Sequence, residues 1–152
     1  MDDRACKTAV LMLGRQSYSS GRLFEKLLEK GYDEPSAAEA VAWCVERRYL
    51  DDETLCRRII EQKAAGGHGE RRIRDFLRSK VFDAELIDRS WETFAESRDP
   101  EEAAEKLMAL CRKLHKGDVW DAREKARVSA ALARRGFGWD EINEAVRGAS
   151  EE

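Results

Sequence analysis

The stretch LFEKLLEKGYD, residues 23–33, decides the fold class of this chain. Its apolar residues recur at i, i+1, i+4 and i+5, which is the spacing of one face of an α-helix. Gly31 then favours the left-handed turn that ends a helix, and Asp33 is suited to cap the next one. The rest of the chain shows the same spacing and no convincing alternation typical of strands. The sequence therefore predicts an all-α protein.

The same pattern of two aliphatic residues and an aromatic residue occurs three times, and a glycine precedes the aromatic residue in the first and third copies. The second copy lies fifty residues after the first and the third lies fifty-five residues after the second, and self-similarity at such a period indicates structural repeats. The aligned positions are Leu23, Leu27, Gly31 and Tyr32; Ile73, Leu77, Val81 and Phe82; and Val128, Leu132, Gly136 and Phe137.

Each aligned helix is preceded by an apolar helix and followed by another amphipathic stretch, so the chain is predicted to hold three repeats of three helices. We expect the repeats to span residues 1–49, 50–98 and 99–152. A repeat of about 50 residues has a marginal core, which favours stacking on its neighbours. We therefore expect an elongated, curved body, right-handed or crescent-like. Val81 replaces the glycine of the second copy, so we expect that turn to be built differently.

Composition excludes several classes of protein. With 152 residues and no apolar run near about 20 residues, the chain has no predicted membrane span, and its acidic first residues do not resemble a secretory signal. The four cysteines form no Cys-x-x-Cys pair, so we expect reduced thiols on apolar helix faces, no metal site and a cytoplasmic protein. A net charge of −3 argues against a simple polyanion-binding protein.

The charge is polarised along the chain, because a basic block at 55–80 is followed by an acidic block at 83–105. Arg71, Arg74 and Arg78 lie at i, i+3 and i+7 and share one face of the predicted helix. We interpret the basic block as a surface that binds an acidic partner or nucleic-acid phosphate; the alternative is an ordinary solvated helix face. The predicted partner-binding residues are Arg57, Arg58, Lys63, Arg71, Arg72, Arg74 and Arg78.

Other candidate sites favour a structural interpretation. The glycine-rich segment 66–69 lacks the Gly-Lys-Ser/Thr ending of a phosphate-binding loop, and an Asp51-Asp52 pair at a helix start is typical of a cap. Trp43 is predicted to lie in the core, and packing is also favoured for Trp120 and Trp139. No histidine has a nucleophilic partner at a useful spacing. We expect neither an enzyme nor a cofactor.

Three features of the chain resemble the RecX regulatory proteins that modulate the RecA recombinase. The first is the Leu-x3-Gly-aromatic turn at residues 27–32 and 132–137, and the second is RYLDD at residues 48–52, where Arg48 replaces the family's glycine. The third is GGHG at residues 66–69 followed by Ile73 and Leu77. The matching structural positions are Gly31, Tyr49, Leu50, Asp51, Asp52, Gly67, Gly69, Gly136 and Phe137.

This resemblance implies a non-enzymatic, monomeric regulator that binds the RecA nucleoprotein filament. Such a protein inhibits RecA ATPase, filament extension and strand exchange, and thereby modulates recombination, DNA repair and the SOS response. Contact with single-stranded DNA would occur through the filament. Two alternatives remain open at this point: a helical module that binds nucleic acid directly, and a helical-repeat scaffold for another partner.

Overall fold

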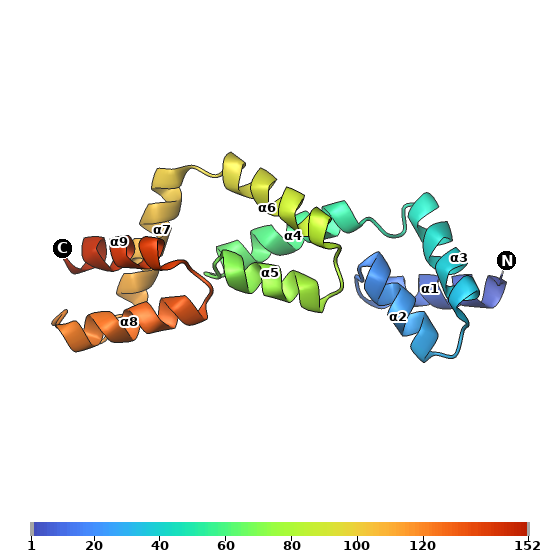
Figure 1. Cartoon of the computed structure of the whole chain (residues 1–152), viewed down its shortest axis with the longest axis horizontal. Helices are drawn as coiled ribbons and strands as arrows, with labels where there is room; N and C mark the ends of the chain where they lie inside the picture. Colours follow the sequence, from blue (N-terminus) through green and yellow to red (C-terminus); the bar gives the residue numbers. More distant parts are fainter. Residues whose placement is uncertain (1, 152) are drawn as a thin grey trace. The chain divides into compact units, whose positions relative to one another are not determined.

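The computed structural model describes residues 2–151, and these residues form an all-α fold without strands (Figure 1). The terminal positions of the first and third predicted repeats, 1 and 152, lie outside the described residues. The helices are α1 (Asp3–Arg15), α2 (Ser20–Glu29), α3 (Glu34–Glu46), α4 (Asp52–Ala65), α5 (Glu70–Ser79), α6 (Ala84–Ser97), α7 (Pro100–Leu114), α8 (Ala122–Arg134) and α9 (Trp139–Ser150).

The chain divides into two compact units. The first holds the chain up to Ile59 together with Phe76–Ser90, and the second holds Ile60–Asp75 together with the chain from Trp91 onward. The boundary between the units therefore passes through α4, α5 and α6. The predicted division into repeats at 1–49, 50–98 and 99–152 stays a prediction.

In the first unit, α1 and α2 both pack against α3. Small side chains such as Ala9, Ala40 and Cys44 are fully buried between the helices, and their size lets the helix backbones approach closely. Leu23 and Leu27 of α2 fill the centre of this core. In the second unit, α7 and α8 pack against α9 around a core of mostly aliphatic side chains. That core contains Leu107, Cys111, Val128, Leu132, Ile142, Ala145, Val146 and Ala149.

Aspartates begin several helices, as their positions in the sequence predict. The carboxylates of Asp33 and Asp99 accept hydrogen bonds from the first amides of α3 and α7, at 2.9 and 3.0 Å, and a proline follows at the start of each helix. Asp51 and Asp83 accept from the amides of Thr54 and Leu86 in the same way. These caps satisfy backbone donors that a helix leaves without a partner.

The turn at Val81 does not follow the prediction. Gly31, Val81 and Gly136 all have positive φ values, of 100°, 62° and 97°. In each turn the amide of this residue donates to the carbonyl three positions earlier, and the next amide donates to the carbonyl five positions earlier. The expectation that Val81 requires a different turn is therefore wrong. The backbone bonds keep the same turn and hold a β-branched residue in the left-handed region, which L-residues disfavour.

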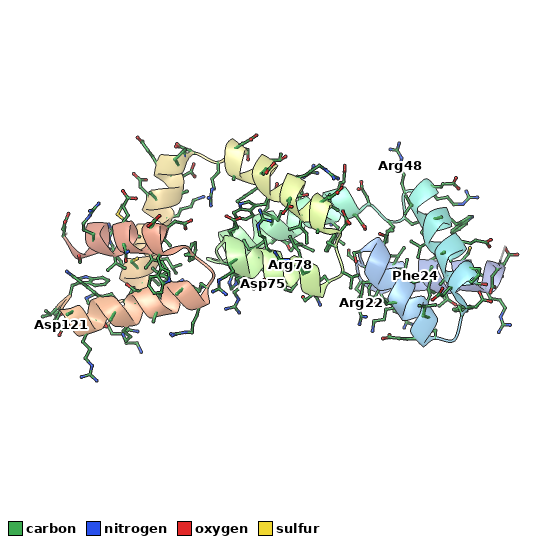
Figure 2. All side chains as sticks on the ribbon, in the orientation of Figure 1. Arg22, Phe24, Arg48, Asp75, Arg78 and Asp121 are labelled. Carbon is green, nitrogen blue, oxygen red and sulfur yellow. The ribbon has the colours of Figure 1, made fainter. Side chains whose placement is uncertain are left out.

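Arg48 occupies a turn of the same kind at the end of α3. Its φ is 60°, its amide donates to Val45 O at 3.1 Å, and the amide of Tyr49 donates to Cys44 O at 3.0 Å. Arg48 is exposed, and Figure 2 shows its side chain extending away from α3. Its side chain makes no hydrogen bond or ion pair among the described residues that would offset the unfavourable backbone conformation.

Candidate partner-binding surface

The predicted basic residues of the first unit lie on α4 and α5. Arg57 and Arg58 are exposed, while Cys56 and Ile60 of the same helix are fully buried. Neither arginine side chain makes a hydrogen bond or an ion pair among the described residues, although Arg57 contributes, as the smallest cause, to the lowered pKa of Asp51. Arg78 on α5 is exposed as well and has an interaction within the chain. Arg57 and Arg58 therefore differ from the rest of the set in being exposed without a hydrogen bond or ion pair among the described residues.

The basic residues of the second unit are engaged with their own chain. Arg74 donates from Nε to Glu70 Oε2 at 2.8 Å, and Lys63 is half-buried with an interaction of its own. Arg71 Nη2 donates to Ala133 O at 2.6 Å. Arg72 Nη1 donates to Arg134 O at 3.2 Å. The structure thus places Arg71 and Arg72 against the C-terminal end of α8, which the sequence spacing does not predict.

Backbone groups complete this contact between the start of α5 and the end of α8. The amide of Gly69 donates to Arg135 O at 2.7 Å, and the amide of Arg71 donates to Gly136 O at 3.2 Å. In return, Arg135 Nη1 donates to Gly67 O at 3.3 Å. The free amides of one helix N-terminus therefore satisfy the free carbonyls of another helix C-terminus. We call this set of contacts, made by residues 67–72 and 133–136, the α5–α8 junction.

Two glycines allow the α5–α8 junction to close. A Cβ atom on Gly69 would lie 2.6 Å from Gly136 C and from Phe137 N. A Cβ atom on Gly136 would lie 2.5 Å from Arg72 N, and the φ of Gly136 is also positive. Both distances are far below van der Waals contact with backbone atoms that cannot move away freely. Gly69 and Gly136, which the motif singled out, therefore have a physical role at this contact.

His68 lies inside the same region and is kept neutral by its surroundings. Its pKa is lowered, mainly by burial and then by the nearby cations Arg72, Lys63 and Arg135. The buried Nδ1 atom of His68 has no hydrogen-bond partner. A neutral imidazole is compatible with three neighbouring cations, whereas protonation would add a fourth positive charge.

A related contact is found in the first unit, between the start of α2 and the end of α5. Ser19 Oγ lies 2.6 Å from Lys80 O and 3.0 Å from Val81 O, and a Cβ atom on Gly21 would meet Val81 O at 2.8 Å. Asp52 accepts hydrogen bonds from the amide and the hydroxyl of Ser20, at 2.8 and 2.6 Å. Asp52, the first residue of α4, therefore binds a partner that lies 32 residues away, where no sequence signal indicates it.

The remaining motif residues and the tryptophans differ in how deeply they are buried and in which side chains they contact. Leu50 is buried, while Tyr49 is 53% exposed and its ring lies 5.8 Å from that of Trp43. Trp43 is only half-buried, at the edge of the predicted core, and the guanidinium of Arg47 lies 4.5 Å from its ring centre. Trp120 stacks on His115 at 4.0 Å, whereas Trp139 is 59% exposed, against the packed position favoured from the sequence.

The described residues offer little reactive chemistry. All four cysteines are buried free thiols, and burial raises the pKa of Cys111 to about 11, so this thiol stays protonated at neutral pH. No group of three or more metal-binding side chains is found among residues 2–151. In the same part of the chain, no helix is both long and apolar enough to cross a membrane.

A groove of about 750 Å³ lies in the second unit, along α7 and the end of α4. Its lining includes apolar side chains such as Phe94, Leu107 and Leu110. Cations such as Lys106 and anions such as Glu102 both contribute to it, and these two side chains pair at 3.3 Å. The groove therefore has no single sign of charge that would select a small anionic or cationic ligand.

Helices in repeated patterns, with helix ends that satisfy one another, define a helical-repeat protein. The family model "RecX, third three-helix domain" matches residues 101–146, which cover most of α7–α9. Regulatory protein RecX of Vibrio campbellii is 31% identical over 141 residues, which cover 92% of this chain and 88% of that protein. Regulatory protein RecX of Vibrio vulnificus is 32% identical over 144 residues, or 93% and 91% of the two chains. The chain belongs to the RecX family of regulatory proteins.

The solved structures agree with this assignment at the level of the fold. The crystal structure of RecX from Lactobacillus salivarius superposes with a TM-score of 0.82 and covers 99% of this chain and 97% of that chain. The two sequences are 15% identical, so this likeness shows the fold alone. A second RecX crystal structure superposes with a TM-score of 0.76 over 96% of this chain and 71% of the other.

Proposed function

We propose that this protein binds the RecA nucleoprotein filament and restrains RecA, lowering its ATPase activity, filament extension and strand exchange. The observation that carries the proposal is the 31% identity to a RecX protein across 92% of the chain, because the family resemblance implies a modulator of RecA. In the cell this activity would modulate recombination, DNA repair and the SOS response. The protein would act as a cytoplasmic monomer through binding, without catalysis of its own.

Of the basic residues predicted from the sequence, the exposed arginines of the first unit, Arg57, Arg58 and Arg78, are the proposed contacts, and Arg57 and Arg58 are the first to test. Both are exposed and lack a partner among the described residues, so binding would not require existing ion pairs to break. Their guanidinium groups suit acidic RecA side chains or the phosphates of the strand inside the filament. By contacting adjacent RecA protomers, the protein would resist the motions that accompany ATP hydrolysis.

The test is the DNA-dependent ATPase of the cognate RecA, titrated with this protein at fixed salt. We expect suppression well below one equivalent per RecA, because a filament-binding protein that limits growth affects many protomers. No suppression at one equivalent, with the protein folded by circular dichroism, would contradict the proposal. Sequence-preferring duplex binding without RecA would instead favour the direct nucleic-acid module.

A charge-reversal pair tests the proposed contacts. Arg57→Glu with Arg58→Glu should weaken suppression by about tenfold or more and reduce its sensitivity to salt, since opposed charges steer and hold such complexes. Lys7→Glu with Lys125→Glu is the matched control, because it changes the net charge equally at exposed positions elsewhere. Equal loss of suppression in both pairs would assign the effect to net charge rather than to Arg57 and Arg58.

A further inference from the structure

Arg71 and Arg72 were predicted from sequence as partner contacts, and both are exposed, yet each guanidinium donates a hydrogen bond within its own chain. Each guanidinium donates to a carbonyl in the last turn of α8, Ala133 O and Arg134 O. The C-terminal end of a helix carries partial negative charge and up to four carbonyls without helical partners, so cationic donors are favourable there. These two arginines are thus placed to hold the end of α8.

The backbone supports the same interpretation, independently of charge. The amides of Gly69 and Arg71 donate to Arg135 O and Gly136 O, and Gly69 is buried beneath this contact. Only a residue without a Cβ atom fits at Gly69, because that atom would lie 2.6 Å from the backbone of residues 136 and 137. The contact uses two guanidinium groups and two glycines of the family motif, Gly69 and Gly136. Together they fasten the first turn of α5 to the last turn of α8.

We propose that Arg71 and Arg72 are positioning residues that hold α8 on the first turn of α5, and that they do not contact the partner. Through α8, the α5–α8 junction positions the segment that the family model matches, residues 101–146. In the first unit, small residues at the start of α2, the N-cap Ser19 and Gly21, contact the end of α5 in a similar way. The part of this inference that concerns RecA inhibition rests on the proposed function.

A double-mutant cycle separates positioning from contact. Gly69→Ala removes no charge and lies at a buried site, so it perturbs the α5–α8 junction without removing a guanidinium from the surface. We expect Gly69→Ala, and Arg71→Ala with Arg72→Ala, each to weaken RecA ATPase suppression about tenfold, and the triple variant to weaken it about tenfold as well. A hundredfold loss in the triple variant, or unchanged suppression by Gly69→Ala, would overturn the inference.

Gly138→Ala is the matched control for the added methyl group. The φ of Gly138 is −77° and a Cβ atom there would meet nothing within 4 Å, so this variant should suppress RecA like the wild type. The salt dependence of suppression gives a second criterion. Arg71→Ala with Arg72→Ala should leave the salt dependence as in wild type, whereas loss of a direct charge contact would reduce it.

A measurement without RecA keeps the inference testable if Gly69→Ala fails to fold or if the protein does not suppress RecA. Amide hydrogen exchange of Gly69 should accelerate about tenfold in Arg71→Ala with Arg72→Ala, because the α5–α8 junction opens locally more often. The amide of Ser20, bound to Asp52 in the other unit, serves as the internal reference and should not change. Unchanged exchange at Gly69 would show that the two arginines do not hold the junction.

Discussion

Replacement of Arg48 by glycine should stabilise the protein. Arg48 has a φ of 60°, and its exposed side chain makes no hydrogen bond or ion pair among the described residues. An L-residue in the left-handed conformation costs roughly 1–2 kcal/mol. Glycine removes this cost but adds about 0.4–1 kcal/mol of entropy to the unfolded chain. The difference between the middle values of these two ranges gives an expected net gain in the free energy of unfolding of about 0.8 kcal/mol.

Urea and thermal unfolding followed by circular dichroism measure this gain. For a chain of this length, a gain of about 1 kcal/mol raises the Tm by roughly 2–4 °C. Arg48→Ala is the control, because alanine keeps the Cβ atom and so keeps the backbone strain while removing the guanidinium. If Arg48→Ala stabilised the protein as much as Arg48→Gly, the side chain rather than the backbone would be responsible and the reasoning would be refuted.

Four further outcomes follow from burial, charge and turn geometry. Leu132→Ala removes a fully buried side chain and should lower the free energy of unfolding by roughly 2–5 kcal/mol, whereas Leu11→Ala, at a side chain 68% exposed, should change it little in the same urea titration. The pKa of Glu124 is lowered from 4.5 to about 2, first by the hydrogen bond from Arg127 and then by that from the amide of Lys116. A lowered pKa in the folded state means that this contribution to stability is complete above about pH 4.5 and is lost as the pH falls toward 2; Glu124→Gln should flatten the pH dependence of Tm in that window. Cys111, with a pKa of about 11, should react with a thiol reagent at pH 8 only as fast as the protein unfolds. Val81→Gly should stabilise less than Arg48→Gly, because the Val81 side chain packs against Gly21 and its loss offsets part of the relieved strain.

Each of these experiments has an outcome that would contradict its basis. Equal losses in the two leucine variants would contradict the described core. A pH dependence of Tm that Glu124→Gln leaves unchanged would place the acid-sensitive group elsewhere. Fast labelling of the native thiols would contradict their burial, and a gain in Val81→Gly above that of Arg48→Gly would show that the contact with Gly21 contributes nothing.

Local features of the chain could be predicted from sequence because their causes are local. The aspartates at 33, 51, 83 and 99 cap helices through amides two or three positions away, and glycines 31 and 136 end helices through their own backbone freedom. The exception at Val81 is instructive. A valine in place of glycine predicted a different turn. The backbone hydrogen bonds at the end of the helix instead hold Val81 in the same left-handed conformation as the glycines.

The partners of the basic residues could not be predicted from sequence. Arg71, Arg74 and Arg78 share a helix face in the sequence pattern, and nothing in that pattern distinguishes an arginine that faces solvent from one that holds another helix. Arg71 and Arg72 donate to carbonyls 62 residues further along the chain. Every residue has a backbone carbonyl, so an accepting carbonyl has no sequence signature. Only the folded backbone shows which carbonyls accept the hydrogen bonds from these arginines.

The sequence by itself determined the all-α class, the helix ends, the buried aliphatic positions and the family, since apolar period, caps and motif order are properties of neighbouring residues. The tertiary structure alone decided which arginines hydrogen-bond to another part of the chain. Arg57 and Arg58 stay exposed without hydrogen bonds, while Arg71 and Arg72 satisfy the end of α8. The physical reason is that a helix terminus leaves backbone groups without partners, and the path of the chain determines which side chains reach them.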